Sequence, residues 1–562
     1  MDISYSNDLF EHIFGDQSEQ PPFSTKGFPT DYFKKLLSIQ RYDLKKKESV
    51  FEKQLDFFGS IDFFVDSILD AVNEGRIHVT DGEKVYICNK SIYYKNSNFM
   101  FFYEENSPAF ILLPSFFSGS AIFDVREKVL IVIHGGHRHL SNQFLNFFQY
   151  IFDQADKALN YLSKDSSFFS GLLAANARPY HFFYDILPAV ELIAHALTDS
   201  EDKAKLVTNP KKIFFDIDEL YSDVFDIEFF ENDFEYLNFK DSFYVDLAVN
   251  KNFVINNDAF REFLDRKVYS VACTYSSIRT SDDQNDYDLN LWFGITSQKR
   301  IWLNQVESIV SLLNSLSPHF TKIRVFIDGW TSCVHLSELD KRCIKQDNEV
   351  FEKISSYLHV NVKAVNLIGY SSQDKIRLGS MVDAFIVNHS AGSLHISRFC
   401  KKVGVSHLNT VMQDDNQIHY NTIRVPDRYI INKKNKRSVE QGAVALDYYV
   451  DFKAVCDRFI DLLTVKGFIS TVSSEVCKNE ASKIYNSMSG VGLTNALRNS
   501  EREPLAKPDL LRESALVMEE YCDINTAYTL MKKAHELRPN GPLIKKKLNE
   551  YSFLLLKSKD GL

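Results

Sequence analysis

The segment between residues 382 and 395 has the residue types needed to hold an anion. An apolar strand is followed by a loop of small and polar residues, which leads directly into the next helix. The unpaired N–H groups at a helix start and the positive end of its dipole favour a phosphate there. Ala391 and Gly392 let a ligand approach closely, and Ser390 and Ser393 carry hydroxyl donors. The same residues also suit an ordinary strand-to-helix turn, so both interpretations stay open.

This segment resembles the donor-binding loop of GT-B glycosyltransferases. The resemblance is carried by the pattern D-x-F-I-x-x-H-x-A-G-x-x-H, which runs from Asp383 to His395. Upstream, the segment Asn176–Pro188 reads N-A-R-P-Y-H-F-F-Y-D-I-L-P and resembles the N-x-x-H-F-x-x-x-L-P signature of family-61-like bacterial and eukaryotic transferases. That family has a second signature, H-G-A-G, where this chain has His389-Ser-Ala-Gly392. The histidine and the small residues are kept, and Ser replaces the first Gly.

The resemblance implies a fold, a reaction and two substrates. The fold is α/β with two tandem Rossmann-like domains of the GT-B type. The reaction is transfer of a sugar from a nucleotide-activated donor, bound by the second domain, to a hydroxyl of a glycan acceptor on the first. No metal and no other cofactor is expected, and the setting is synthesis of a bacterial surface polysaccharide, capsule or lipopolysaccharide. The donor-binding residues implied in the loop are His389, Ser390, Ala391, Gly392, Ser393 and His395.

A transfer without a metal must neutralise the leaving diphosphate with N–H groups and basic side chains. Arg300 follows the apolar run 289–295 and is the first candidate, ahead of Lys299 and Arg377. Asp328, in the Asp-Gly-Trp sequence after the next apolar run, is a candidate for holding the nucleoside. Arg300 as a surface cation and Asp328 in an ordinary turn are the competing interpretations.

The acceptor hydroxyl needs a general base within hydrogen-bond reach. His181 and Asp185 are four residues apart, so on a helix they share one face and could form a base and its orienting partner. His134, His137 and Asp216 are rival candidates for the same role. Phe182 and Phe183 follow His181, and beside them this histidine could also be a core residue.

Two other chemistries have partial motifs. Ile133-His-Gly-Gly136 resembles the oxyanion loop of esterases, and Asn388–Gly392 differs from the G-x-S-x-G nucleophile elbow at its first residue, with His419 downstream as a triad base. Asp216-Ile-Asp218 has the D-x-D form of a metal-dependent transferase. A non-catalytic scaffold that binds a glycan or a protein partner is a third alternative.

The composition limits the class of protein. The 562 residues include 65 Lys and Arg against 75 Asp and Glu, a formal charge of −10, which argues against broad contact with nucleic acid. The eight cysteines have no metal-type spacing and fit a reducing cytosol. No secretory leader and no membrane-length apolar run is recognisable. We therefore expect a cytoplasmic protein, with peripheral association at the inner face of a membrane as an option.

Strands and helices that would position these residues follow one another in an α/β order. The strand 129–133, the loop 134–139 and the helix after it form the first α/β unit expected. In the second half, strands are expected at 267–275, 289–295, 323–327, 360–367 and 384–387, and helices at 302–316, 348–358 and 394–400. The domains predicted are a helical segment 1–75 that begins an N-terminal α+β extension, an α/β acceptor domain 76–265, a Rossmann-like donor domain 266–435 and a helical tail 436–562.

The tail has features of a single tetratricopeptide-like (TPR-like) repeat. Ala515, Ala527, Ala534 and Pro539 fit its small-residue and proline positions. Such repeats normally stack in groups of about three, so a helical appendage packed on the second domain is the simpler expectation. These helices are also the part expected to reach a membrane or a protein complex.

Overall fold

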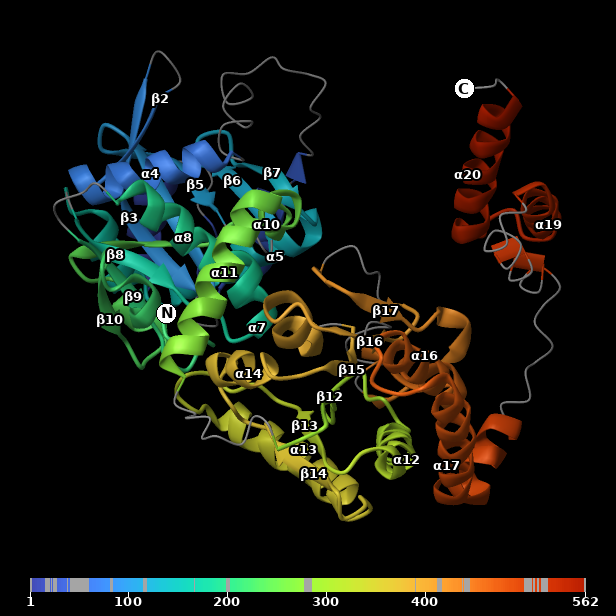
Figure 1. Ribbon diagram of the computed structural model, residues 1–562. Helices are drawn as coiled ribbons and strands as arrows, with labels where there is room; N and C mark the ends of the chain where they lie inside the picture. Colours follow the sequence, from blue (N-terminus) through green and yellow to red (C-terminus); the bar gives the residue numbers. More distant parts are fainter. Residues whose placement is uncertain are drawn as a thin grey trace. The chain divides into compact units, whose positions relative to one another are not determined.

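The structure is a computed structural model in which the chain divides into two compact units, residues 1–482 and 483–562 (Figure 1). The residues that it describes are 3–15, 21, 23, 28–37, 39–40, 60–80, 84–114, 119–165, 167–198, 203–276, 286–389, 391–411, 417–436, 438, 445–499, 508, 511–512, 515–516 and 524–559. Among them, no helix is long and apolar enough to span a lipid bilayer.

A seven-stranded sheet of order β1-β7-β6-β5-β4-β3-β2 begins the first unit. Strands β2 to β7 form an antiparallel meander, and only β1 pairs in parallel, with β7. The α/β unit predicted for residues 129–151 is therefore wrong in its sheet type, because the apolar run that suggested a parallel strand is part of this meander. The strands are β1 (Ile39–Gln40), β2 (Ile77–Thr80), β3 (Val85–Tyr94), β4 (Ser97–Glu104), β5 (Ser107–Leu113), β6 (Gly119–Asp124) and β7 (Val129–Gly135).

Phenylalanine side chains pack the helices α1, α2 and α5 against one face of this sheet. Phe147 of α5 stacks on Phe99 of β4 with ring centroids 3.7 Å apart, and Phe33 of α2 packs edge-on against Phe10 of α1 at 6.3 Å. The core on this face accounts for many of the chain's 46 phenylalanines. The helices of this region are α1 (Ile3–Phe14), α2 (Thr30–Leu36), α4 (Ile61–Glu74), α5 (His137–Asp153) and α6 (Ala155–Leu162).

A second sheet has four parallel strands in the order β10-β9-β8-β11. Counted from its first strand this order is 3-2-1-4, so the chain reverses its direction of winding between β8 and β11. In such sheets the crevice at the carboxyl ends of the two strands that flank the reversal is the usual ligand position. The elements are β8 (Phe168–Ala174), α7 (Pro179–His181), the π-helix η1 (Phe182–Ile186), α8 (Leu187–Ala196), β9 (Ala204–Thr208), α9 (Asp218–Tyr221), β10 (Phe225–Phe229), the 3₁₀ turn η2 (Phe234–Leu237), β11 (Ser242–Asp246) and α10 (Lys251–Asn256).

The third sheet has six parallel strands in the order β14-β13-β12-β15-β16-β17. This order is 3-2-1-4-5-6, that of the doubly wound Rossmann arrangement, with the reversal between β12 and β15. The predicted strands at 289–295, 323–327, 360–367 and 384–387 are confirmed. The elements are β12 (Leu289–Gly294), α12 (Gln305–Leu316), η4 (Ser317–His319), β13 (Ile323–Asp328), α13 (Glu338–Ser355), β14 (Val362–Asn366), α14 (Ser372–Gly379), β15 (Ala384–Asn388), η5 (Ala391–Ser393), the π-helix η6 (Leu394–Phe399), β16 (Val403–His407) and β17 (Thr422–Arg424).

Residues 267–275 are not the predicted strand but the end of helix α11 (Asp258–Tyr275). Leu264, Val268 and Ala272 are buried at helical spacing, and the helix begins at Asn257, whose side chain accepts the N–H of Phe260. The β-branched and aromatic composition of the segment was outweighed by this periodicity. Helix α11 packs against α9 and also against α14 and η6, so it connects elements of the second sheet to elements of the third.

The remaining elements of the first unit follow the third sheet. They are η7 (Asp427–Tyr429), the antiparallel pair β18 (Ile430–Lys433) and β19 (Asp447–Val450), α16 (Phe452–Val465) and α17 (Thr471–Asn499), whose last residues belong to the second unit. Strand β19 lies in the segment predicted to be a helical tail, so that segment is not entirely helical.

The second unit contains two paired helices, α19 (Ile524–Leu537) and α20 (Pro542–Lys559). The alanines Ala515, Ala527 and Ala534 are buried in its core with Met531, Ile544 and Tyr551. Their packing agrees with small residues at helix contacts, while the repeat itself and the boundaries of the four predicted domains stay predictions.

Candidate functional site

The loop after β15 lies at the winding reversal of the six-stranded sheet. Asn388, the last residue of β15, donates from Nδ2 to the hydroxyl of Tyr448 at 2.7 Å, and the backbone N–H of His389 donates to His407 O at 2.8 Å. Tyr448 is fully buried on β19, and its hydroxyl also lies 3.0 Å from Nδ1 of His407. The loop is thus fastened to its neighbours at its start. Ser390 lies outside the described residues, and for Ala391 only the backbone is described.

Histidines surround this loop, and burial keeps them neutral. The rings of His389 and His419 stack with centroids 3.6 Å apart, Nδ1 of His389 lies 2.7 Å from Ser406 Oγ, and Nδ1 of His419 lies 3.1 Å from Ser393 Oγ. Loss of solvation lowers the pKa of His389 to about 3 and that of His419 to about 4. At neutral pH these imidazoles can hydrogen-bond a neutral ligand group, but they supply no positive charge.

Two of the predicted donor-loop features differ from expectation. Residues Ala391–Ser393 form a short 3₁₀ turn, and a single π-helical stretch, η6, follows it in place of a regular α-helix. A terminus this short contributes little dipole, so the anion site expected from the helix start is weaker than the sequence suggested. His395 is 1% exposed and its Nε2 lies 2.9 Å from Ser372 Oγ, so it contacts the interior helix α14.

One arginine follows a strand at the winding reversal of each parallel sheet. Arg300 lies in the loop after β12 with a left-handed backbone (φ 55°), and Arg178 follows β8 of the four-stranded sheet. Burial lowers the pKa of the Arg300 guanidinium, the tyrosine hydroxyl of Tyr448 opposes this, and the positive charge of Arg178 lowers it further. Neither side chain has a carboxylate or other hydrogen-bond partner in the described part of the chain. Two mutually repelling guanidiniums without an acid form a site suited to an anion.

The loop of Arg300 is fastened to β19. Ile301 N donates to Asp447 Oδ1 at 2.9 Å, and Tyr448 N donates to Ile301 O at 2.9 Å. Both bonds are made by Ile301, the residue after Arg300, and they help to hold the left-handed backbone of Arg300 in place. The sequence candidate Arg300 and the loop 388–393 are thereby tied to the same strand, β19.

His181 and Asp185 make the predicted pair. Nδ1 of His181 lies 2.6 Å from Oδ2 of Asp185, so their position on one helical face is confirmed. The pair lies just after β8, where Pro179 starts α7 and the chain continues as the π-helix η1. Burial raises the pKa of Asp185, whose side chain is 1% exposed, and the contact with His181 opposes that rise. π-Helical turns are rare and are often found at functional sites.

Asp328 is engaged in the interior of the third sheet. Its carboxylate lies 2.5 Å from Nζ of Lys375, with both side chains at 3% exposure or less. Lys375 also donates to the carbonyls of Gly329 and Trp330 at 3.1 and 3.2 Å. This ion pair fixes the Asp-Gly-Trp turn, and the competing interpretation of an ordinary turn accounts for these contacts.

His134 and His137 lie at the end of β7 and the start of α5, and their backbone alone is described. The His-Gly-Gly sequence therefore belongs to the antiparallel sheet, whereas Asn388–Gly392 follows a strand of the six-stranded parallel sheet. An esterase builds its oxyanion loop and nucleophile elbow on one sheet, so this arrangement gives the esterase interpretation no support.

Sequence reasoning missed Arg178, His407 and Tyr448 as site residues. His407 is the last residue of β16, and a rule that inspects the carboxyl end of each parallel strand would have found it. Arg178 stands inside the segment 176–188 already singled out. Tyr448 gave no sequence signal, because only tertiary packing brings β19 to the loop.

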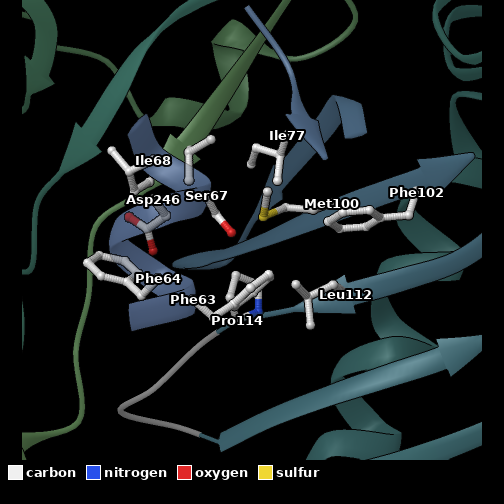
Figure 2. A pocket seen from close by; sticks show the side chains of 11 residues that line it. Phe63, Phe64, Ser67, Ile68, Ile77, Met100, Phe102, Leu112, Pro114 and Asp246 are labelled. Atoms are coloured by element: carbon white, nitrogen blue, oxygen red, sulfur yellow. The ribbon is translucent and has the colours of Figure 1, made fainter. Parts of the chain in front are cut away.

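A pocket lies elsewhere in the first unit, between α4 and the strands β2, β4, β5 and β11 (Figure 2). It encloses about 400 Å³ including the solvent at its mouth. Oγ of Ser67 and Oδ1 of Asp246 have no hydrogen-bond partner among the described residues, and burial raises the pKa of Asp246 to about 7. The other lining residues are Phe63, Phe64, Ile68, Ile77, Met100, Phe102, Leu112, Pro114 and Val245.

No group of three or more His, Cys, Asp or Glu side chains in the described ranges could hold a metal ion. In the Asp216-Ile-Asp218 sequence, Oδ1 of Asp216 instead accepts the N–H of Asp218 at 3.1 Å. The expected metal independence stays a prediction. The chain matches no protein-family model and no curated protein sequence.

Proposed function

We propose that this protein is a GT-B-type glycosyltransferase that moves a sugar from a nucleotide-activated donor to a hydroxyl of a glycan acceptor. The observation that carries the proposal is the placement of Arg178 after β8 and Arg300 after β12, the strands at the winding reversals of two parallel sheets in one unit; the charge of Arg178 lowers the pKa of Arg300, and neither has an acid partner among the described residues. A ligand held at both reversals would meet two uncompensated positive charges.

The leaving diphosphate is the group that these arginines would stabilise. When the bond between the anomeric carbon and the diphosphate oxygen breaks, negative charge grows on the diphosphate. Arg178 and Arg300 would neutralise it. The neutral His389 and His419 suit hydroxyl or amide groups of the donor, since burial keeps both uncharged.

The His181–Asp185 pair would serve the acceptor. The acceptor oxygen forms its bond to the anomeric carbon and passes its proton to Nε2 of His181, because Nδ1 is engaged by Asp185. Asp185 would fix the orientation of the ring and stabilise the imidazolium that forms. His134 and His137 remain alternative bases.

The resemblance of residues 176–188 and 383–395 to family-61-like transferases supports the same reaction class and suggests the setting, bacterial surface polysaccharide synthesis. We propose a cytoplasmic enzyme, and the C-terminal helices α19 and α20 as the part that would bring it to a membrane or a protein complex.

A thermal-shift screen of UDP-, GDP-, CMP- and dTDP-sugars tests the proposal. We expect one nucleotide family to raise Tm, and Arg300→Ala or Arg178→Ala to remove most of that shift. Arg342→Ala is the matched control, because Arg342 is an exposed arginine on α13. Two outcomes would contradict the proposed donor site: no nucleotide sugar raises Tm, or the same nucleotide sugar raises Tm equally in the unaltered protein and in all three arginine variants. Full transfer activity in the His181 and arginine variants would assign the reaction to other residues, and absence of transfer by the unaltered protein with every donor would favour a scaffold instead.

A further inference from the structure

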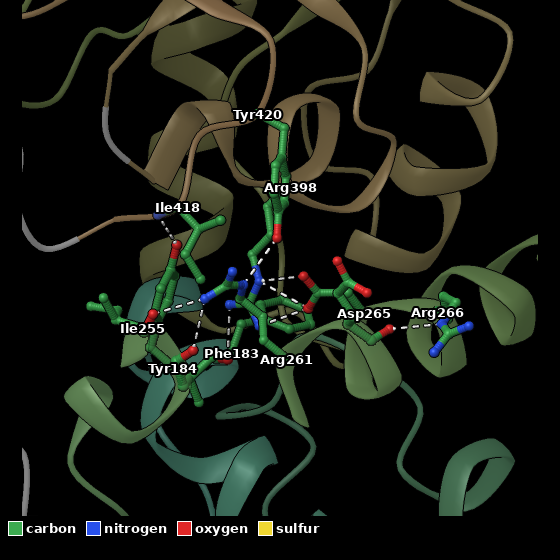
Figure 3. A network of polar contacts seen from close by, with 11 residues as sticks. Phe183, Tyr184, Ile255, Arg261, Asp265, Arg266, Arg398, Ile418 and Tyr420 are labelled. Carbon is green, nitrogen blue, oxygen red and sulfur yellow. Dashed lines mark hydrogen bonds and ion pairs between the residues drawn. The ribbon is translucent and has the colours of Figure 1, made fainter. Parts of the chain in front are cut away.

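Three successive residues, Ile418–Tyr420, contact elements that follow strands of the four-stranded sheet and elements that belong to the six-stranded sheet. The N–H of Ile418 donates to the hydroxyl of Tyr184 at 2.8 Å, and Nε of Arg261 donates to the hydroxyl of Tyr420 at 2.9 Å (Figure 3). Tyr184 belongs to η1 and Arg261 to α11. The residues on either side of His419 are therefore attached to the N-terminal part of the unit.

His419 itself turns to the donor loop. Its Nδ1 lies 3.1 Å from Ser393 Oγ, and its ring stacks on His389 at 3.6 Å. Tyr420 is also bound to η6, since its N–H donates to Ser397 Oγ at 3.0 Å and its carbonyl accepts from the same hydroxyl at 3.1 Å. A shift of this segment would therefore displace a side chain that packs directly on the loop.

A buried ion pair supports the attachment. Arg398 of η6 binds Asp265 of α11 through Nε and Nη2 at 3.0 and 2.8 Å and donates to Phe183 O at 3.2 Å. Its guanidinium also lies 4.5 Å from the ring centroid of Tyr184, the tyrosine that holds Ile418. Because Tyr184 and Asp185 are neighbours on η1, the His181–Asp185 pair and the loop 388–393 are joined through one continuous set of contacts.

We propose that Ile418–Tyr420 couples the loop 388–393 to the His181–Asp185 pair, and that His419 is a positioning residue for this loop. The segment sets the loop at a fixed place relative to His181 and Asp185. This inference rests on the proposed function only for the identity of the ligand, since the coupling itself belongs to the unliganded protein.

Amide hydrogen exchange of the full-length protein tests the coupling. The variant Tyr184→Phe/Tyr420→Phe removes the two hydroxyl acceptors and keeps both rings. We expect amides of residues 391–400 to exchange about two- to tenfold faster than in the unaltered protein, the loss that one or two ordinary hydrogen bonds produce. Tyr150→Phe is the control. Tyr150 lies on α5, and its hydroxyl accepts a hydrogen bond from Asn238 at 2.9 Å, so this variant also loses a tyrosine hydroxyl acceptor but none of the contacts of Ile418–Tyr420.

Faster exchange at 417–422 with unchanged exchange at 391–400 would overturn the coupling, as would an equal increase throughout the first unit. A second pair of variants isolates His419. His419→Phe keeps the stack and loses the polar contact with Ser393, whereas His419→Gln keeps a polar group; we expect faster exchange at 391–400 in the first and substantial recovery in the second. Equal effects of both would also overturn it.

Inorganic pyrophosphate separates the coupling from the proposed donor site. If both are correct, pyrophosphate slows exchange at 391–400, and the double tyrosine variant needs about two- to tenfold more of it for the same protection. If pyrophosphate protects none of the proteins, the diphosphate site is contradicted, while the exchange difference without ligand still decides the coupling.

Discussion

Nδ1 of His181 lies 2.6 Å from Oδ2 of Asp185, where the short helix α7 that follows β8 of the four-stranded parallel sheet continues into the π-helix η1. The carboxylate is almost entirely buried and the imidazole is 23% exposed. The pair therefore has the arrangement of a base whose orienting partner is shielded from water, and it follows β8, one of the two strands that flank the winding reversal of this sheet.

Asp185→Asn should lower transfer turnover while leaving the donor-induced thermal shift unchanged. The amide can still orient the ring, but it cannot stabilise the imidazolium, so we expect a loss of about 100-fold or more in kcat. The measurement is the transfer rate with the donor that the thermal-shift screen identifies. The kcat of His181→Gln should fall by a similar factor. If His181→Gln keeps its activity, the base is another residue.

Asp265→Ala should strongly destabilise the protein. The substitution leaves the fully buried guanidinium of Arg398 without its carboxylate, a situation that typically costs about 3–5 kcal/mol in the free energy of unfolding. Chemical denaturation measures this cost. Lys453→Ala is the control, because Lys453 pairs with Asp457 on the surface and its loss should cost less than about 1 kcal/mol. The double variant Asp265→Leu/Arg398→Met should recover much of the loss, and its failure to do so would point to the other contacts of Arg398.

Asp246→Asn should make the protein more stable at pH 8 and flatten its pH dependence. Burial raises the pKa of Asp246 to about 7 in the folded protein, above its unfolded value near 3.9. The folded state then holds the proton more tightly, so this stabilisation is complete below about pH 4 and is lost as the pH rises through 7. From pH 5 to pH 8 the loss is about 2–3 kcal/mol, measured by denaturation at several pH values. An unchanged pH profile in the variant would show that the carboxyl is solvated through the pocket mouth.

His407→Gln should reduce the loss of stability in mild acid. Burial lowers the pKa of His407 to about 3, below the unfolded value near 6.5. Between those values the unfolded chain binds a proton that the folded protein does not, so stability falls as the pH drops from 7 towards 4, by about 2 kcal/mol at pH 5. Denaturation at pH 5 and pH 7 measures the difference. His319→Gln is the control for a histidine outside the cluster, and an equal change in both variants would contradict the assignment to His407.

Much of the six-stranded parallel sheet could be predicted from the amino-acid sequence. Largely apolar runs such as 289–295 and 323–327 have the length of a buried strand, and a polar loop follows each. The same local grammar placed Arg300, the loop 388–393 and the His181–Asp185 pair at strand or helix ends. These are properties of short segments, and short segments determine them.

Other parts of the fold could not be predicted in this way. The run at 129–133 looks like a parallel strand, and the choice between parallel and antiparallel pairing depends on its neighbours β6 and β1. Residues 267–275 have strand-forming side chains, and packing of Leu264, Val268 and Ala272 made them helical. Local preference was weaker than the burial of one helical face.

The sequence by itself determined which side chains are available for chemistry: an arginine after β12, a histidine four residues before an aspartate, and a loop of small residues before η6. Only the tertiary structure decided which of them meet. It engaged Asp328 with Lys375, turned His395 into the interior, and brought Arg178 into electrostatic range of Arg300. The physical reason is that strand order and burial are settled by contacts between distant segments, and no spacing within a segment specifies those contacts.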